Sequence, residues 1–243
     1  MIKCVLFDLD GTLLPLNHDE FAREYFRHIG EQVGKVVAPN KFISQLLSST
    51  EAMVKSTDKT KTNQQVFFED FLPRIGVAQE ILLPLIDEFY ETGFALVKST
   101  TQCNADARRV VMAVSECGLD VVVATNPILP VSAVKQRLVW AGVGDIDFKL
   151  VTSYEHCHFC KPHTEYYREI AERIGLLPEE CMMVGNDVEE DLASAQVGMI
   201  TYLVTDCLLN SKNIDIKADY TGTLHELAQT ITKIINNENE KWS

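Results

Sequence analysis

The sequence predicts an α/β fold in which helices cover both faces of a parallel sheet. Short apolar stretches recur along the chain, and each is followed by a segment with helical periodicity, which is the pattern of a parallel sheet. One long interval, from Leu14 to about Thr101, has helical periodicity and no convincing strand. A simple crossover between parallel strands needs only about 30 residues. The sequence therefore predicts a parallel-sheet core with a helical module inserted after the first strand.

Apolar stretches rich in Val, Leu, Ile and Met are the predicted strands. They are Lys3–Leu9, Asp120–Ala124, Phe148–Thr152, Cys181–Val184 and Met199–Val204. Their residues do not alternate between apolar and polar, which is typical of strands that are buried on both faces. Gly11 follows the first strand and Gly185 ends the fourth, so the chain can turn sharply at both points.

Helices are predicted between these strands. They cover Asn104–Cys117, Pro130–Ala141, His163–Ile174 and Val188–Gln196. A glycine follows each of them, where a left-handed cap residue is favoured. We expect Trp140 and the pair Tyr166–Tyr167 to be packing residues, because they lie at helical positions. The tail from Ile234 to Ser243 turns polar, and we expect it to fray.

Within the inserted module, apolar side chains follow helical faces. One face has Phe21, Tyr25, Phe26 and Ile29, a second has Phe42, Ile43, Leu46 and Leu47, and two more helices are expected over Val66–Ile75 and Ile81–Val97. Pro73 and Pro84 fall near the ends or early turns of the last two, where proline is tolerated.

Composition and charge exclude several classes of protein. The chain has 243 residues and a net charge of −13, which disfavours nucleic acid and anionic membranes as partners. No stretch approaches the roughly 18 apolar residues of a spanning helix. Asp8 and Asp10 interrupt any export signal at the N-terminus, so we expect a cytoplasmic protein. Its 7 cysteines follow no scaffold spacing, so we expect most of them to be reduced and buried.

Two aspartates lie at the end of the first predicted strand. Asp8 and Asp10 are two residues apart, so on a strand their side chains point to the same side. At the carboxyl end of a parallel strand, that side faces the crevice in which ligands bind. Two like charges this close are unfavourable unless a cation lies between them. Asp and Gly are also common turn residues, but the paired acids favour a functional site.

Polar residues also follow the later strands. Thr125 and Asn126 offer a hydroxyl and an amide that can bind an anionic oxygen, and Lys161, before a predicted helix, can pair with phosphate. Asp187 and Asp191 are four residues apart, hence on one face of the helix predicted there. Each of these residues alone has a common structural role, such as a cap or a first-turn acid. The prediction therefore rests on their combination.

Together these residues resemble the motifs of the haloacid dehalogenase-like (HAD) hydrolase superfamily. The matching residues are Asp8-Leu9-Asp10-Gly11-Thr12, Thr125, Lys161 and Gly185-Asn186-Asp187-x-x-x-Asp191. Their order, strand context and spacing all match, and the resemblance covers the whole chain. The insertion resembles the helical type 1 cap of phosphoglycolate phosphatase-like members. The resemblance implies a Rossmann-like core domain of residues 1–15 and 100–243, with a helical cap domain of residues 16–99.

The resemblance also implies a function, a Mg²⁺-dependent phosphomonoester hydrolase that acts on a small phosphorylated metabolite. Asp8 would be the nucleophile that becomes an aspartyl phosphate, and Asp10 would be the general acid and base. Mg²⁺ would bind the carboxylates of Asp8 and Asp187 and the backbone carbonyl of Asp10. Asp191 would ligate the metal through water or orient Lys161.

The resemblance assigns the phosphoryl oxygens to Thr125, the Asn126 amide and Lys161. A local cluster of Mg²⁺ and Lys161 would let an acidic chain take an anionic substrate. One residue departs from the family pattern, because Pro127 follows Asn126 where a small residue is more usual. Proline has no N–H, so one backbone donor is absent there.

A zinc site is the competing interpretation of one further segment. Residues 156–160 and His163 offer one Cys-x-x-Cys spacing and three histidines. A structural zinc normally needs a second ligand pair at a suitable spacing, and none is evident. We interpret the segment as a loop beside Lys161.

Three other functions on the same fold compete with the phosphatase interpretation. A haloacid dehalogenase has no need for a metal or for an acid at Asp10, so the Asp-x-Asp pair favours phosphate. A phosphomutase would share this core and cap, and nothing in the sequence excludes it. A non-catalytic binding module would be expected to have lost an acid or the lysine, and this chain has kept both. The substrate, the cap residues that contact it and the oligomeric state are open at this point.

Overall fold

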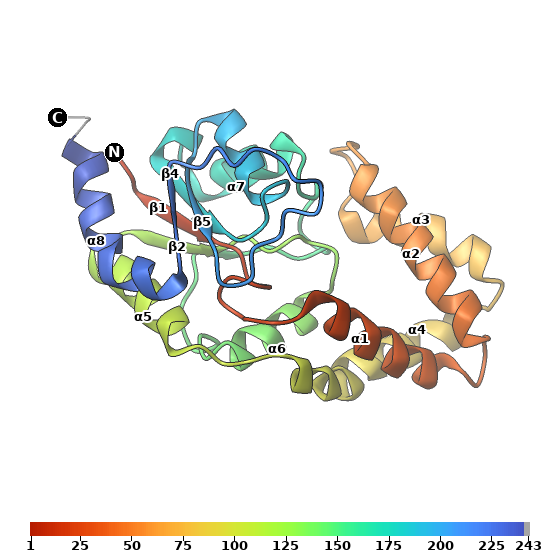
Figure 1. Ribbon diagram of the computed structural model, residues 1–243. Coiled ribbons are helices and arrows are strands. Elements are labelled where there is room, and N and C mark those ends of the chain that lie inside the picture. The colour runs from red at the N-terminus through yellow and green to blue at the C-terminus, as the bar shows by residue number, and fades with distance from the viewer. Residues whose placement is uncertain (241–243) are drawn as a thin grey trace.

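The computed structural model describes residues 1–240, and its centre is an all-parallel sheet (Figure 1). The strands are β1 (Cys4–Phe7), β2 (Asp120–Val123), β3 (Leu150–Val151), β4 (Cys181–Gly185), β5 (Ile200–Val204) and β6 (Tyr220–Gly222). Within the described residues they form one 6-stranded sheet in the order β3-β2-β1-β4-β5-β6. The predicted α/β fold with a parallel sheet is confirmed. Because β1 lies between β2 and β4, the carboxyl ends of these three strands are neighbours.

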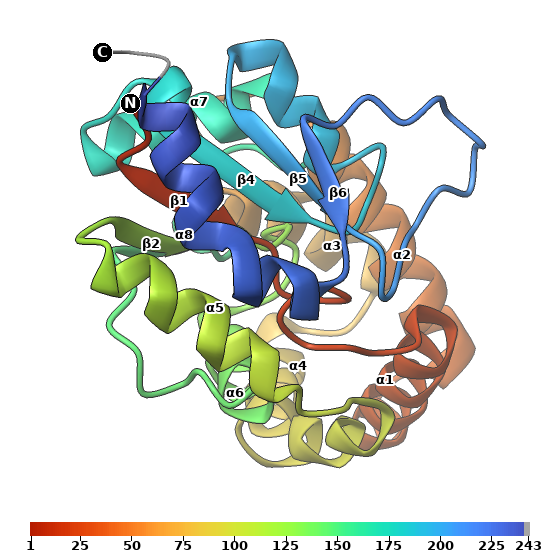
Figure 2. The same ribbon diagram turned by 60° about the vertical axis from the view of Figure 1, so that its left-hand side comes forward.

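Helices cover the sheet on both faces (Figure 2). One face carries α5 (Ala105–Glu116), α6 (Val131–Trp140) and α8 (Leu224–Glu240), and the other carries α7 (Thr164–Ile174) and the 3₁₀ helix η4 (Asp191–Val197). A second 3₁₀ helix, η3 (Pro178–Glu180), precedes β4.

Alternate residues of each strand serve the two faces. On β1, Val5 and Phe7 belong to the buried cluster under α5, α6 and α8, whereas Cys4 and Leu6 belong to the cluster under α7 and η4. This alternation is the two-residue period of a strand. It explains why the strands are continuously apolar in sequence. Because both faces are covered, polar side chains lie at the carboxyl ends of the strands.

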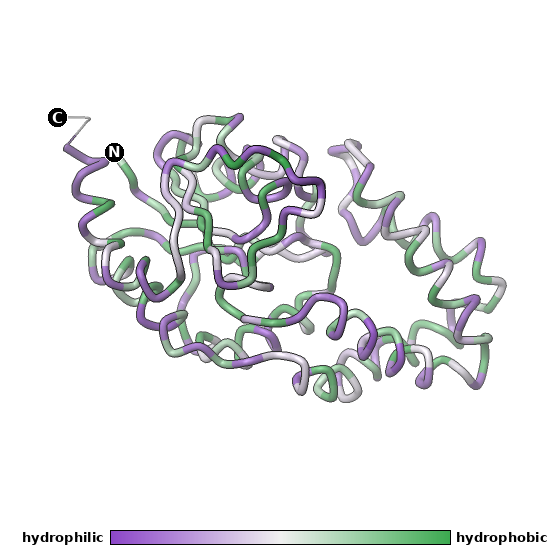
Figure 3. The backbone as a smooth tube through the Cα atoms, in the orientation of Figure 1, coloured by the Kyte–Doolittle hydropathy of each residue, from purple (hydrophilic) through white to green (hydrophobic). Residues whose placement is uncertain are grey.

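The inserted segment between β1 and β2 is helical, as predicted. Its elements are α1 (His18–Val33), α2 (Pro39–Lys55), α3 (Asn63–Ile75), α4 (Gln79–Glu88), the π-helix η1 (Phe89–Gly93) and the 3₁₀ helix η2 (Phe94–Thr100). Residues 17–100 contain no strand. Hydrophobic and hydrophilic residues alternate along these helices, as in amphipathic helices that pack on one face (Figure 3).

The two connections of the insertion run side by side. Leu16 and Thr101 form an isolated antiparallel bridge, and the backbone N–H of Gln102 donates to the carbonyl of Pro15 at 2.9 Å. The chain therefore leaves the sheet and returns to it at nearly the same place. No helix among residues 1–240 has the length and apolar character that crossing a membrane requires.

The insertion packs on the core mainly through α6. Phe94 stacks on Trp140 with ring centroids 5.2 Å apart, and the Gln136 side chain donates to the carbonyl of Tyr90 at 2.6 Å. The packing roles predicted for Trp140 and for Tyr166–Tyr167 are confirmed, since all three side chains are buried. The two tyrosines also have a second role, because their hydroxyls donate to backbone carbonyls at the site described below.

Two expectations were wrong. The predicted helix over Val188–Gln196 is a turn followed by the 3₁₀ helix η4, and the Asp187 side chain caps the turn at its start. The tail does not fray at Ile234, since α8 continues to Glu240 and buries Ile231, Ile234 and Ile235 along one stripe. Residues 241–243 lie outside the described residues. The strand β6 and the helix α8 were not predicted.

Candidate active site

The carboxyl end of β1 places two aspartates beneath the insertion. Asp8 follows the strand directly, its backbone N–H donates to Val184 of β4 at 2.8 Å, and its side chain is almost fully buried. Gly11 then turns the chain with a φ of +85°, and a Cβ there would lie 2.4 Å from the Asn186 amide nitrogen. A side chain at position 11 is therefore excluded twice, by conformation and by space. Asp10 lines the same cavity as Asp8.

Lys161 joins Asp8 to Asp191. Its Nζ lies 2.8 Å from Asp8 Oδ1 and 2.6 Å from Asp191 Oδ1, and the lysine is only 1% exposed. Burial raises the pKa of Asp8 to about 7, against the opposing pull of Lys161. Burial also lowers the pKa of Lys161, but the carboxylates of Asp191 and Asp8 raise it more, so the lysine stays charged. The sequence predicted these residues near one another, and the structure brings them together.

The end of β4 holds the other acidic pair through backbone contacts. Asp191 Oδ2 accepts a hydrogen bond of 2.9 Å from the backbone N–H of Asp187. Asp187 Oδ1 in turn accepts from the N–H groups of Glu189 and Glu190, both at 2.8 Å. A Cβ at Gly185 would lie 2.1 Å from the Asp191 carboxylate. The glycine thus gives the carboxylate room to reach Lys161.

Asn186 links the ends of β1 and β4. It accepts a 2.8 Å hydrogen bond from the Thr12 hydroxyl and donates to the carbonyl of Cys207, also at 2.8 Å. It is 1% exposed. Thr12 and Asn186 were part of the recognised motif but had no predicted role. Their hydrogen bond fixes the two aspartate-bearing loops relative to each other.

The end of β2 contributes Thr125 and Asn126. The Thr125 backbone is held by hydrogen bonds to its carbonyl from the hydroxyls of Thr152, at 2.7 Å, and Tyr166, at 2.8 Å. Its own side chain lines the cavity. The Asn126 carboxamide is engaged within the protein, because it accepts from the N–H of Lys161 at 3.2 Å and donates to Glu190 at 2.9 Å. The side chain therefore positions Lys161, while its contact with phosphate stays a prediction.

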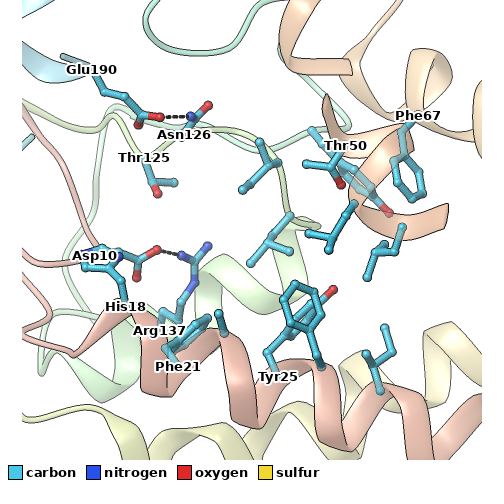
Figure 4. Close-up of a pocket in the computed structure, with 18 of the residues that line it drawn as sticks. Asp10, His18, Phe21, Tyr25, Thr50, Phe67, Thr125, Asn126, Arg137 and Glu190 are labelled. Atoms are coloured by element: carbon cyan, nitrogen blue, oxygen red, sulfur yellow. Dashed lines mark hydrogen bonds and ion pairs between the residues drawn. The ribbon is translucent and has the colours of Figure 1, made fainter. Parts of the chain in front are cut away.

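Arg137 is a site residue that sequence reasoning missed. It extends from α6 to form an ion pair with Asp10 Oδ2 and is only 1% exposed (Figure 4). Its Nη2 atom and Asp10 Oδ1 are both buried without a hydrogen-bond partner among the described residues. The available signal was an arginine among the apolar residues of a predicted helix. Because Arg137 occupies Oδ2, it leaves Oδ1 as the oxygen that faces no protein group.

Glu190 was also missed. It lines the cavity beside Asn126, and burial raises the pKa of its carboxyl to about 8. Its backbone carbonyl accepts a hydrogen bond of 2.5 Å from the Tyr167 hydroxyl. Among the described residues, it has no cationic side chain as an ion-pair partner.

The charges around the cavity fit a divalent cation. Asp8 and Asp191 share Lys161, Asp10 has Arg137, and Asp187 has no cationic partner within residues 1–240. Carboxylate and carbonyl oxygens are the ligands of Mg²⁺, which keeps several waters as well. No group of three His, Cys, Asp or Glu side chains in the described chain could hold a metal ion by itself. The predicted set needs only two carboxylates and the Asp10 carbonyl, so the donors suit Mg²⁺ with water.

The segment considered for zinc has structural contacts instead. His158 Nδ1 lies 2.8 Å from Glu169, and His163 Nε2 lies 2.9 Å from the carbonyl of Val54 on the insertion. Cys157 and Cys160 are both buried, and burial raises the pKa of the Cys157 thiol to about 12. The segment is a loop that supports Lys161 and contacts the insertion.

Asp8, Asp10, Thr125, Asn126 and Asp187 line one cavity of about 520 Å³ between the sheet and the insertion. Figure 4 shows Asp10, Thr125, Asn126 and Arg137 at one end, with Tyr25 and Phe67 of the insertion at the other. The catalytic candidates that line this cavity therefore face a space partly covered by the insertion.

Comparison with known proteins agrees with this geometry. The model of the haloacid dehalogenase-like hydrolase family matches residues 2–198. The chain is 28% identical over 207 residues to the glyceraldehyde 3-phosphate phosphatase of Methanopyrus kandleri, which covers 83% of each chain. It is 26% identical over 242 residues to the protein of the same name from Methanocaldococcus jannaschii, covering 96% of this chain and 99% of that relative.

A solved structure shows the same fold. It is the HAD-hydrolase YfnB of Bacillus subtilis, described as bound to magnesium and as revealing interdomain movement. The TM-score is 0.55 at 20% identity, over 95% of this chain and 98% of that one. The family match spans the first four strands and every residue of the predicted site. The chain therefore belongs to the haloacid dehalogenase-like hydrolases and is a phosphatase of that family.

Proposed function

We propose that this phosphatase hydrolyses a small phosphomonoester with Mg²⁺ through an aspartyl phosphate on Asp8. The observation that carries the proposal is the buried ion pair of Asp8 with Lys161, 2.8 Å long, in which Asp8 also lines the cavity. A carboxylate held this close to a buried cation can face an anionic substrate without strong net repulsion.

Asp8 supplies the attacking oxygen in this proposal. Lys161 contacts only its Oδ1 atom, so Oδ2 is the oxygen available to form a bond with phosphorus. The bond from phosphorus to the alcohol oxygen of the substrate breaks as the bond to Asp8 forms. Water then attacks the same phosphorus, which releases inorganic phosphate and restores the carboxylate.

Asp10 acts as general acid in the first step and as general base in the second. Its Oδ1 atom has no protein partner, so it can give a proton to the leaving alcohol oxygen and later take one from water. Arg137 holds the other oxygen of Asp10 and so fixes the direction of the carboxyl group. In this account Arg137 is a positioning residue for Asp10.

The metal and phosphate ligands follow from the same arrangement. Asp8, Asp187 and the backbone carbonyl of Asp10 would hold Mg²⁺, which supplies positive charge for the transferring phosphoryl group when bound. The family membership and a magnesium-bound structure with the same fold support this assignment. Thr125 and Lys161 would hold phosphoryl oxygens, with Asn126 keeping Lys161 in place through its backbone.

Residues 16–99 act in this proposal as a cap domain on a core of residues 1–15 and 100–243. The adjacent connections at Leu16 and Thr101 suit a hinge. A second contact would have to part for opening, since the Asn63 side chain donates to the carbonyls of Pro127, at 3.3 Å, and Phe159, at 3.2 Å. Closure would exclude bulk water from the aspartyl phosphate.

The substrate class is a small phosphorylated metabolite. Two archaeal relatives are named for the hydrolysis of glyceraldehyde 3-phosphate, which supports a small phosphate ester.

Phosphate release from p-nitrophenyl phosphate and from a panel of phosphomonoesters, with and without Mg²⁺, tests the proposal. We expect release that depends on Mg²⁺ and disappears in Asp8→Asn. The exposed Asp147 offers the control variant Asp147→Asn, which should keep wild-type activity. Release that persists in Asp8→Asn would contradict the mechanism.

A further inference from the structure

The cavity above the site has two ends of different chemistry. The catalytic end is formed by Asp8, Asp10, Thr125, Asn126 and Asp187. The apolar end is formed by side chains of the insertion, among them Tyr25, Phe42, Leu46, Phe67 and Ile86. Figure 4 shows the two ends facing each other across the open space. A substrate whose phosphate lies at the catalytic end must extend its alcohol part toward the apolar end.

The apolar end offers few partners to a polar substrate. Within the described residues, the insertion contributes no lysine and no arginine to the cavity wall. The hydroxyls of Tyr25 and Tyr90 bond to each other at 2.7 Å, which leaves them less available to a ligand. The Thr50 hydroxyl is a polar group on the α2 wall, and His18 lies beside Asp10 at the catalytic end (Figure 4). Asp19 and Tyr154 are further polar residues of the lining. Sugar hydroxyls buried here would lose hydrogen bonds with water and regain few.

The size of the cavity also favours a substrate with a larger apolar group. Its volume of about 520 Å³ lies within the range of about 300–1,000 Å³ that is usual for drug-sized ligands. A three-carbon phosphate ester would leave much of the apolar wall without contacts. An apolar group of larger size would cover that wall and remove its surface from water.

We propose that the alcohol part of the substrate is apolar, so that the enzyme hydrolyses phosphomonoesters of aromatic or branched aliphatic alcohols. The inference rests on the proposed phosphatase function, and it deepens that function by naming the substrate class. The helices of the insertion select the alcohol by apolar contact, while the strand ends act only on the phosphate.

The test compares esters that differ in the alcohol part alone. The substrates are 2-naphthylmethyl phosphate, glycerol 1-phosphate and glyceraldehyde 3-phosphate, all esters of primary alcohols, so that acidity of the leaving group does not decide the outcome. We expect kcat/KM for the naphthylmethyl ester to be at least about tenfold higher than for either three-carbon ester, as apolar pockets discriminate on this scale. Equal values, or a preference for a three-carbon ester, would overturn the inference.

A variant that narrows the cavity from the insertion sharpens the test. Ala22 lines the cavity from α1, whereas its neighbour Arg23 is exposed and does not. Ala22→Phe should lower kcat/KM for the naphthylmethyl ester by about tenfold or more and change that for glycerol 1-phosphate by less than about threefold. Arg23→Phe adds the same side chain to the same helix and should change neither. An equal loss on both esters in Ala22→Phe would contradict selection by this wall.

A binding measurement separates this inference from the phosphatase proposal. Calorimetry compares 2-naphthylmethylphosphonate with methylphosphonate, neither of which can be hydrolysed as an ester. We expect binding of the naphthyl compound to be at least about tenfold tighter, and the difference to vanish in Ala22→Phe. If no ester is hydrolysed but this difference is present, the proposed reaction fails, whereas the apolar selectivity of the cavity stands. If both phosphonates bind equally, the inference fails whatever the turnover.

Discussion

The two ends of the cavity are built on opposite principles. At the catalytic end, the ends of β1 and β4 crowd carboxylates of Asp8, Asp10, Asp187 and Asp191 against two buried cations. At the apolar end, amphipathic helices present aromatic and aliphatic side chains to the same space. Burial, together with the charges of Asp191 and Asp10, raises the pKa of Asp8, so the first arrangement is electrostatically unfavourable without a ligand. The second stabilises the fold by apolar burial.

This difference assigns the chemistry to the strand ends and the substrate selectivity to the insertion. Substitution of the Asp8 nucleophile should lower turnover greatly and change stability little, or even favourably, whereas loss of the cation Arg137 should lower both. Substitutions in the insertion should change which substrate is accepted and how firmly the insertion is held. The following predictions test this division, starting with the largest effect.

Asp8→Asn should reduce turnover by a factor of about 10³ or more, because an amide cannot form the acyl phosphate. Measured with EDTA, the variant should melt at the same or a higher temperature than wild type. The pKa of Asp8 in the folded protein is raised to about 7, so its charge lowers stability as pH rises from about 4 through 7. The stabilisation should therefore be clear at about pH 8 and fade near pH 4. A variant that melts lower at pH 8 would contradict the electrostatic account.

Arg137→Met should lower kcat by about tenfold to a hundredfold and leave KM for small esters nearly unchanged, because it frees Asp10 to rotate. Arg137→Lys should recover part of kcat. Loss of a buried ion-pair partner also costs stability, by about 3–5 kcal/mol, so melting is measured alongside. The exposed pair of Arg108 with Asp145 supplies the control Arg108→Met, expected to behave as wild type. Unchanged kcat in Arg137→Met would remove the positioning role.

Mg²⁺ should raise the melting temperature of the wild type by about 5–10 °C at a hundred times its dissociation constant. In Asp187→Ala the shift should be largely lost, since a ligand is missing, whereas the exposed control Asp147→Ala should keep it. Thermal denaturation monitored by circular dichroism with Mg²⁺ or EDTA measures both. Identical curves with Mg²⁺ and EDTA for the wild type would show that the metal assignment is wrong.

Asn63→Ala should have the smallest effect, a loss of about 1–2 kcal/mol in the free energy of unfolding. The side chain bonds the insertion to Pro127 and Phe159 of the core. If this contact closes the cap, the variant should also show a higher KM with kcat little changed. Asn40→Ala, at an exposed position of α2, is the matched control. An unchanged KM together with reduced stability would make the contact purely structural.

Much of this fold could be predicted because most strands of the core have a local signature. Continuous apolar stretches predicted β1, β2, β3, β4 and β5, and the long helical interval predicted the insertion. The strand β6 has few apolar residues, and its pairing with β5 depends on distant parts of the chain. The prediction that the tail frays from Ile234 was wrong because the exposed residues of α8 are polar, while Ile231, Ile234 and Ile235 form a buried stripe.

At the site, the residues with motif spacing could be predicted, whereas their partners could not. Asp8, Lys161 and Asp191 follow strand ends or begin helices, and the structure brings their charged atoms together. Arg137 is remote in sequence from Asp10 and reaches it only because α6 packs beside β1. From the sequence, Glu190 is only an acid in the first turn of a predicted helix, and its buried contact with Asn126 appears only in the structure. The apolar end could not be predicted either, because helical periodicity does not show which apolar side chains line a cavity.

The central claim is that Asp8 carries the phosphoryl group, and chemical trapping tests it most directly. The enzyme is mixed with a phosphomonoester and Mg²⁺, quenched within one turnover and reduced with borohydride, which converts an aspartyl phosphate to homoserine. Peptide mass spectrometry should find homoserine at position 8 in the wild type and nowhere in Asp8→Asn. Modification at another residue, or full turnover with position 8 unmodified, would contradict the account.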